Sequence, residues 1–254
     1  MTDEQRLEKN KRIKEAGQAT REKRKHQICK VFIVKIDESR LTLKQAEQLL
    51  MIFVEAKWMY NDALTFSKEN NIADYDTKTK NVTVINKDKI PETRELKYIG
   101  SQMKQSVLAG MLSSIKSLAT RKKNGGTVGA LKYISEYPSL NLIQYGNTYK
   151  IYSHNKMKIQ GISKKIIVNG LDQFIDIPGI EIANARILNK PDGYYIAITT
   201  YQNIDSFPEK EYIGEEIGID FGIKNNITLS NGETFNWIST GRTPQIYIFS
   251  SLIR

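Results

Sequence analysis

Residues 180–201 read IEIANARILNKPDGYYIAITTY, and this stretch decides the fold that the sequence predicts. The segments 180–188 and 194–201 are rich in β-branched and aromatic residues, which favour strands. Between them, residues 189–193 contain the proline, aspartate and glycine that are typical of a hairpin turn. Several short strands separated by turns predict a small β-barrel or curled sheet. The other segments predicted to join it are 148–153, 156–159 and 165–168.

One strand and two helices are predicted upstream of this region. Residues 28–36 predict a strand, because they are rich in β-branched residues with lysines interleaved. Thr42 and Gln45 have the spacing of a capping box, so a helix is predicted from there to about Phe66. A second helix is predicted over 94–121, where apolar residues recur at three- and four-residue spacing. If the first strand completes the barrel, the helices are an insertion between its first two strands, and the fold class is α+β.

The composition indicates a basic protein without a membrane span. The chain has 254 residues and a formal net charge of +10. This excess of positive charge favours a polyanionic partner such as a nucleic acid, with a basic protein that binds none as an equal alternative. No apolar run is long enough to cross a membrane, and no signal peptide is predicted, so we expect a cytoplasmic location. Cys29 is the single cysteine, which predicts neither an internal disulfide nor a zinc site.

Several basic segments are candidate contacts for a nucleic acid. Residues 1–27 are dominated by lysine and arginine and predict a frayed helix or a disordered arm, which either contacts phosphates or is a solvated tail. The basic loop at 121–126 either complements the dipole of the preceding helix or contacts a phosphate backbone. The lysines that we expect to contact phosphates are Lys122, Lys123, Lys164, Lys165 and Lys224.

Tyrosines are interleaved with lysines in and around the β-rich region. Basic and aromatic side chains on a small barrel suit contacts with a nucleic-acid backbone and stacking on bases. Each tyrosine taken singly is explained as well by the preference of tyrosine for sheets. The region as a whole therefore predicts binding more strongly than any one residue. The tyrosines are Tyr133, Tyr137, Tyr145, Tyr149, Tyr152, Tyr194, Tyr195 and Tyr201.

An aspartate near the end of the chain is the candidate metal ligand. Asp220 lies in an apolar strand predicted over 216–221, which is followed by a strand at 225–230, a hairpin turn at Asn231-Gly232 and a third strand at 234–237. On the first strand of such a meander the carboxylate can emerge on one face. Carboxylates placed in this way hold Mg²⁺ in nucleases that use two metal ions. A structural aspartate satisfied by a turn is the common alternative.

The residues around Asp220 resemble a known family. IGIDFGIKN at 217–225, followed by TLSNG at 228–232, closely resembles the first nuclease motif of the TnpB (OrfB) proteins of insertion-sequence transposons, which have a RuvC-like nuclease of RNase H fold. The resemblance implies an RNA-guided DNA endonuclease with Mg²⁺ as cofactor and Asp220 as a catalytic and metal-binding residue. Its partners would be a guide RNA from the transposon end and a target DNA found by base pairing.

The resemblance also implies an arrangement of domains. It places a basic arm at 1–27, a wedge-like β-barrel at 28–40 and 142–212, a helical recognition domain at 41–141, and the first β-hairpins of a RuvC-like nuclease at 213–254. Coverage extends over nearly the entire chain, although only the motif around Asp220 is specific.

The chain departs from the family after this motif. It ends at Arg254, before the glutamate, the second aspartate and the four-cysteine zinc ribbon that the family carries. We therefore expect a C-terminally truncated member that binds nucleic acid and does not cleave it alone, with Asp220 as the one inherited metal ligand. Three alternatives stay open: an active nuclease completed by a second chain, a guide-dependent DNA-binding repressor without catalysis, and a decayed product that folds poorly.

Overall fold

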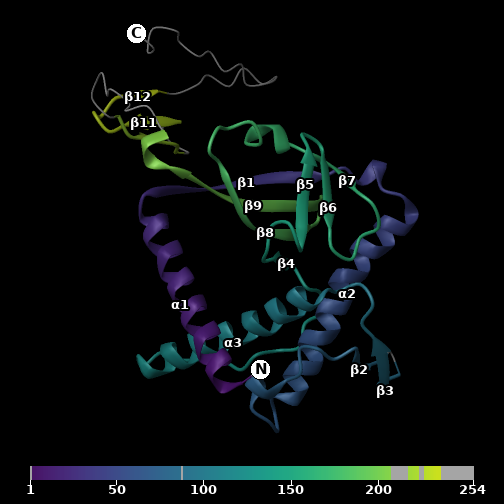
Figure 1. Ribbon diagram of the computed structural model, residues 1–254. Helices are drawn as coiled ribbons and strands as arrows, with labels where there is room; N and C mark the ends of the chain where they lie inside the picture. The colour runs from purple at the N-terminus through teal and green to yellow at the C-terminus, as the bar shows by residue number, and fades with distance from the viewer. Residues whose placement is uncertain (1, 87, 207–216, 223–225, 236–254) are drawn as a thin grey trace. The chain divides into compact units, whose positions relative to one another are not determined.

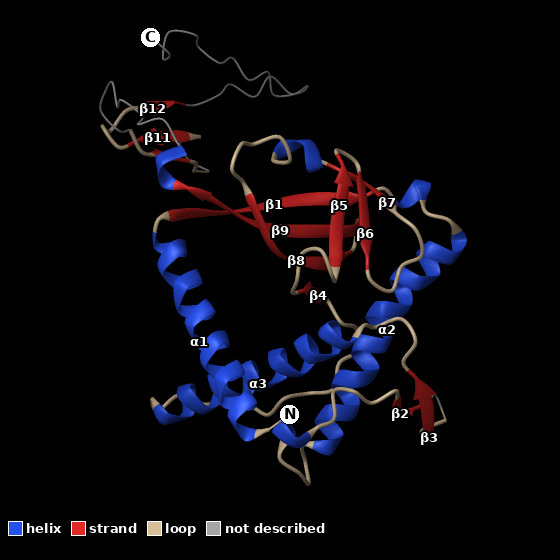
Figure 2. Ribbon diagram, in the orientation of Figure 1, coloured by secondary structure: helices blue, strands red, loops and turns tan. Residues whose placement is uncertain are grey.

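The computed structural model describes residues 2–86, 88–206, 217–222 and 226–235 (Figure 1). The chain divides into two compact units, Met1–Phe207 and Pro208–Arg254. The first unit contains the helices and a large antiparallel sheet, and the second contains a small sheet (Figure 2). The fold is therefore α+β, as the sequence predicts.

A seven-stranded antiparallel sheet forms the body of the first unit. Its strand order is β4-β8-β9-β1-β7-β6-β5. Tyr145, just after β4, bridges to Tyr149 at the start of β5, so the two edges of the sheet lie close together. The sheet is thus a nearly closed barrel, which confirms the prediction. The strands are β1 (Gln27–Ile36), β4 (Ser139–Leu142), β5 (Tyr149–Ser153), β6 (Lys156–Ile159), β7 (Ile166–Asn169), β8 (Glu181–Lys190) and β9 (Gly193–Asn203).

The predicted hairpin is formed by β8 and β9. It runs from the Glu181↔Tyr201 pair to the Lys190↔Gly193 pair at the turn. Gly193 has a φ of 123°, in the left-handed region where glycine is favoured. Alternate residues of the hairpin point into the barrel and are buried. They include Ala185, Ile187, Ile196 and Ile198.

The first strand completes the barrel, also as predicted, because β1 pairs with β9 on one side and with β7 on the other. One strand was not indicated by the sequence. β4 begins at Ser139, upstream of the expected start of the β-rich region at residue 142 and inside the range assigned to the helical insertion. It pairs with β8 through Leu140↔Ile187, and both of these side chains are completely buried. The barrel therefore begins earlier in the chain than expected.

Two long helices, α2 (Leu43–Phe66) and α3 (Ser101–Lys123), lie between β1 and β4 in the chain. The predicted capping box is present, because Thr42 and Gln45 each accept a hydrogen bond from the backbone N–H of the other. The prediction that the second helix begins at residue 94 is wrong. Pro91–Glu95 forms β3, which pairs with β2 (Asn81–Ile85) in a separate hairpin.

A buried carboxylate explains the late start of α3. Glu55 of α2 is 1% exposed, and its two oxygens accept hydrogen bonds from the backbone N–H groups of Lys97, Tyr98 and Ile99 at 2.8–2.9 Å. These three N–H groups satisfy a carboxylate that would otherwise be buried without partners. The segment is consequently held as a turn, and the helix begins only after it.

The helices pack directly on the barrel. Gly161, after β6, has a φ of 88°, and a Cβ atom there would lie 2.3 Å from the carbonyl oxygen of Tyr98. Only glycine permits so close an approach in that conformation. Phe53 of α2 packs against Tyr194 of β9 with 5.5 Å between ring centroids. The insertion and the barrel therefore share one continuous apolar core.

The N-terminal arm is a continuous helix, α1 (Asp3–Lys25), that a second capping box between Thr2 and Gln5 begins. Apart from Gly17 and Arg24, its described side chains are exposed. Among the described residues, no helix combines the length and apolar character needed to cross a bilayer. The short 3₁₀ helices are η1 (Glu38–Arg40), η2 (Ile72–Asp74), η3 (Leu171–Gln173) and η4 (Ile204–Ser206).

The second unit contains the predicted antiparallel meander. Its strands are shorter than predicted: β10 (Ile219–Asp220), β11 (Ile227–Leu229) and β12 (Thr234–Phe235). Gly232, with a φ of 91°, closes the turn between β11 and β12 through a hydrogen bond from its N–H to the Leu229 carbonyl. The turn predicted at Asn231-Gly232 is therefore confirmed.

Candidate nucleic-acid interface

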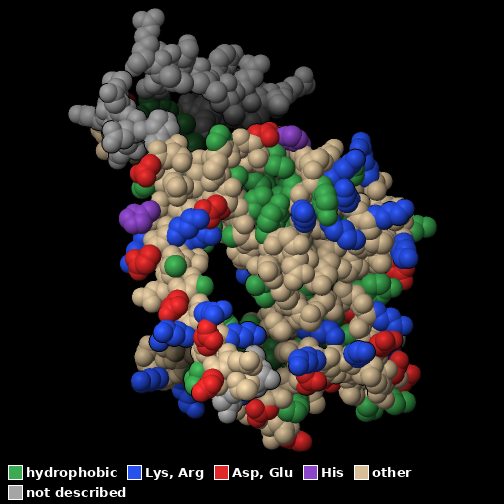
Figure 3. All heavy atoms as spheres, in the orientation of Figure 1, with side chains coloured by type: hydrophobic (Ala, Val, Ile, Leu, Met, Phe, Trp, Pro, Cys, Tyr) green, Lys and Arg blue, Asp and Glu red, His purple; other side chains and the backbone are tan. Residues whose placement is uncertain are grey.

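The outer face of β5, β6 and β7 is the main candidate surface. Strand alternation points most apolar side chains of these strands into the barrel and leaves the lysines of β5 and β6 outside. Lys150 of β5 and Lys158 of β6 are direct cross-strand neighbours. Lys and Arg side chains gather over these strands in Figure 3. Burial lowers the pKa of Lys158, whose ammonium group donates to the Ile162 carbonyl. Of the lysines on this face, Lys158 is therefore the least available to a ligand.

A tyrosine organises part of this surface. The Nζ atom of Lys165 lies 3.9 Å from the centroid of the Tyr152 ring, and that of Lys150 lies 5.4 Å from it. We call these three residues the Tyr152 group. Cation–π attraction to the ring offsets part of the repulsion between the two ammonium groups. Within the described part of the chain, neither lysine forms an ion pair with a carboxylate.

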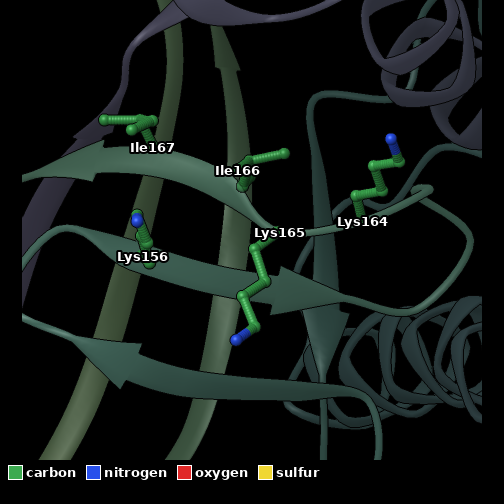
Figure 4. Close-up of a pocket in the computed structure, with 5 residues that line it drawn as sticks. All are labelled: Lys156, Lys164, Lys165, Ile166 and Ile167. Carbon is green, nitrogen blue, oxygen red and sulfur yellow. The ribbon is translucent and has the colours of Figure 1, made fainter.

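Of the predicted pair Lys164 and Lys165, the second belongs to this group and the first is its neighbour in the chain. Together with Lys156, Ile166 and Ile167, the two lysines line a pocket of about 510 Å³. Figure 4 shows the two side chains extending in different directions, with Lys165 crossing the neighbouring strands and Lys164 pointing away from them. The structure therefore brings Lys165, rather than Lys164, together with the lysines of β5 and β6.

The loop that carries the pair is held by two glutamines of α2. The Gln45 side-chain amide donates to the carbonyls of Ser163 and Lys165 at 2.9 and 3.2 Å, and Gln48 Oε1 accepts from the Ser163 N–H at 2.7 Å. Both glutamines are buried. Lys164 has a φ of 57°, which is uncommon for a residue other than glycine and requires support from the surroundings. Hydrogen bonds within the protein thus support the backbone of this loop.

A second tyrosine also has two lysine neighbours, but its charge environment is different. The Nζ atoms of Lys190 and Lys35 lie 4.6 and 5.1 Å from the centroid of the Tyr195 ring. We call these three residues the Tyr195 group. Here the tyrosine hydroxyl donates to Asp192, and Lys35 forms an ion pair with the same carboxylate at 3.8 Å. The positive charge of this group is therefore partly neutralised by the protein itself.

The distribution of carboxylates along the chain could have located the Tyr152 group from the sequence. Glu136 is the only Asp or Glu between Leu96 and Leu171. This long stretch includes the strands β5–β7 and the whole of α3. Its lysines and arginines therefore create a local excess of positive charge that the overall net charge does not reveal.

The end of α3 forms a second basic surface. Lys122 and Lys123, which the sequence places in a loop, belong to the last helical turn. The glycines after them form a helix-terminating Schellman motif, because the N–H groups of Gly125 and Gly126 donate to the carbonyls of Lys122 and Arg121. A polar pocket of about 590 Å³ lies on this part of the helix. It is lined by Ser113, Lys116, Ser117, Thr120, Arg121, Asn124 and Gly126.

The basic helix α1 is attached to the barrel at one end. Glu181 of β8 accepts from Lys23 at 2.5 Å, from Arg24 at 3.0 Å and from Gln27 at 2.9 Å. The hydrogen bond from Lys23 is the main reason that the pKa of Glu181 is lowered. The Arg24 guanidinium also lies 3.6 Å from the Tyr201 ring centroid. The C-terminal end of α1 is therefore attached to the barrel by specific contacts, which the sequence did not indicate.

The predicted metal ligand lies in the second unit. Asp220 is exposed on β10 and pairs with Thr228 of β11, which in turn pairs with Thr234 of β12. Its carboxylate thus shares a face of the meander with two threonines. Among the described residues, no group of three or more His, Cys, Asp or Glu side chains could hold a metal ion.

The four predicted site lysines of the first unit do not meet in one place. Lys164 and Lys165 lie beside β7, and Lys122 and Lys123 lie at the end of α3, in another part of the first unit (Figure 1). Lys224 lies outside the described residues. Comparison with known protein families finds no match for the chain, and comparison with curated proteins finds no significant match.

Proposed function

We propose that this chain binds a nucleic acid through the outer face of β5–β7, with the end of α3 and the helix α1 as further phosphate contacts. The observation that carries the proposal is the Tyr152 group. Two lysines converge there on one ring and have no carboxylate partner among the described residues. Sequence-independent binding of nucleic acids depends mainly on such contacts between lysines and phosphates.

The resemblance of residues 217–232 to the TnpB nuclease motif supports a more specific partner. Under this proposal the ligands are a guide RNA and a target DNA, the barrel acts as the wedge, and α2 and α3 act as the recognition part. Residues 213–254 are then the beginning of a RuvC-like nuclease of RNase H fold. The order of the elements, with a helical insertion in a barrel and a β-meander after it, is consistent with this assignment.

We also propose that this chain alone does not cleave DNA. Asp220 is the single catalytic residue that the resemblance assigns, and a Mg²⁺ pair requires further carboxylates. Purified protein, guide RNA and Mg²⁺ should leave a matching DNA duplex intact. If cleavage is observed and Asp220→Ala abolishes it, the proposal is wrong. Cleavage that begins only when a second chain is added favours the alternative of a nuclease assembled from two chains.

Binding is tested with two matched double variants. Lys150→Gln/Lys165→Gln removes both cations of the Tyr152 group, and Lys35→Gln/Lys190→Gln removes both cations of the Tyr195 group. Affinity for a single-stranded RNA is measured by fluorescence anisotropy over a series of salt concentrations. The first variant should reduce the slope of log K against log salt by about 1.4, because each lost phosphate contact contributes about 0.7 on a single strand. The second variant should leave the slope unchanged, and equal slopes for all three proteins would contradict the proposal.

A further inference from the structure

We infer that Tyr152 positions lysines for the phosphate backbone and does not stack on a base. This inference rests on the proposed function and deepens it. It assigns the ligand group of the β5–β7 face as a backbone phosphate, so that recognition there is independent of the bases. An exposed tyrosine on a small barrel is otherwise a natural platform for base stacking.

The first argument is that a lysine already occupies the Tyr152 ring. Tyr152 is 49% exposed, yet the Lys165 ammonium lies over its ring at 3.9 Å from the centroid. A base could stack on that face only after this cation moves away. Keeping the cation in place and adding a phosphate beside it requires no such movement. The geometry therefore favours phosphate binding over stacking.

The second argument is that Lys165 is held at both ends of the residue. Its backbone carbonyl accepts a hydrogen bond from the buried amide of Gln45, and its ammonium group rests on the Tyr152 ring. A lysine restrained in this way loses less conformational freedom when it binds an anion. Such restraint is useful for a phosphate contact and has no role in stacking.

The third argument comes from the Tyr195 group, which serves as an internal control. Its two lysines approach a ring to similar distances, but Asp192 supplies the negative charge that they need. The Tyr152 group has the same cations without a carboxylate partner among the described residues. An external anion is therefore the complementary ligand for the Tyr152 group only.

The test compares the affinity for a 20-nucleotide DNA strand with the affinity for a fully abasic strand of the same length. Both are measured against the parent protein, Tyr152→Phe, Tyr152→Leu and the control Tyr195→Leu, with thermal unfolding used to show that each variant is folded. The parent should bind the two strands with affinities within about twofold, since the phosphates are the same. Tyr152→Leu should weaken both by about two- to fivefold, as expected for loss of cation–π contacts at an exposed site. Tyr152→Phe should restore binding, because the ring is retained, and Tyr195→Leu should have no effect.

The opposite pattern overturns the inference. If Tyr152 stacks on a base, the parent prefers the strand with bases by about fivefold or more, and Tyr152→Leu reduces only that preference. An equal affinity of Tyr152→Leu and the parent for both strands also overturns it. Failure of the proposed function looks different: the Lys150→Gln/Lys165→Gln variant would then bind both strands as tightly as the parent.

Discussion

The Tyr152 and Tyr195 groups each contain one tyrosine and two lysines, and they differ in the charged residues around them. In each, two lysine ammonium groups lie within 5.4 Å of one tyrosine ring. Asp192 joins the Tyr195 group, so hydrogen bonds and ion pairs close the arrangement within the protein. No carboxylate among the described residues joins the Tyr152 group. The two groups therefore differ in the pairing of their charges, and not in the presence of lysines and a tyrosine; the proposed function assigns binding to the unpaired group.

The largest effect is expected at Gly161, where the helical insertion packs closely on the barrel. Gly161→Ala would place a Cβ atom 2.3 Å from the Tyr98 carbonyl oxygen, and the residue would keep a positive φ. Rigid backbone lies on the other side of this contact, so we expect a loss of about 3 kcal/mol or more in the free energy of unfolding. Urea denaturation measures it. Gly17→Ala on the exposed helix α1, where a Cβ meets no atom within 4 Å, is the control and should not destabilise the protein.

A smaller loss is expected at the turn beside the Tyr195 group. Gly193→Ala introduces strain at a φ of 123° and brings a Cβ atom to 2.2 Å from Glu38 Oε1. The glutamate side chain can move, so the expected loss is about 1–3 kcal/mol in the same measurement. Because the change affects only the Tyr195 group, affinity for RNA at a temperature where the variant is folded should match that of the parent. Weakened binding would show that the two groups are not independent.

The loop next to Tyr152 gives a test of preorganisation. Gln45→Leu leaves the carbonyls of Ser163 and Lys165 without their hydrogen-bond donor. We expect a loss of about 1–2 kcal/mol in stability, because these hydrogen bonds and the capping-box hydrogen bond from the Thr42 N–H are lost. We also expect weaker binding of RNA, although no charge has been removed. Unchanged affinity in the folded variant would show that the loop does not need to be held in advance.

The smallest effect is expected for the pH dependence of the stability that Asp192 contributes in the Tyr195 group. The hydrogen bond from Tyr195 is the main cause of the lowered pKa of Asp192. A carboxyl group whose pKa is lowered by folding stabilises the native state above its unfolded pKa of about 3.9, and this contribution is lost as the pH falls through the folded value. The Tm difference between the parent and Asp192→Asn should therefore be small at pH 6 and disappear as the pH falls through the lowered pKa of the folded state. A difference that grows in acid would contradict this assignment.

The barrel could be predicted from the sequence because its signals are local. The hairpin turn near Gly193, the alternation along β8 and β9, and the capping box at Thr42 each act over a few residues. The start of α3 could not be predicted, because the N–H groups of residues 97–99 bind a carboxylate more than 40 residues earlier in the chain. The helical periodicity of the sequence does not predict these hydrogen bonds.

The candidate site was only partly predictable for the same reason. Sequence reasoning selected Lys165 and Tyr152 among many similar residues, but their contact depends on the pairing of β5, β6 and β7. Lys164 was given equal weight because it is adjacent in the chain, and the left-handed backbone turns it elsewhere. The scarcity of carboxylates between Leu96 and Leu171, where Glu136 is the single one, is the local signal that could have narrowed the choice of lysines.

The attachment of α1 has a mechanical consequence. A helix of 23 residues is roughly 35 Å long, and the contacts made by Lys23, Arg24 and Gln27 all lie at its C-terminal end. A rotation of about 10° at Glu181 would displace the opposite tip by roughly 6 Å, by the geometry of a rod of that length. The ion pairs of Glu181 at one end of α1 thus limit how far the lysine and arginine side chains at the other end can move.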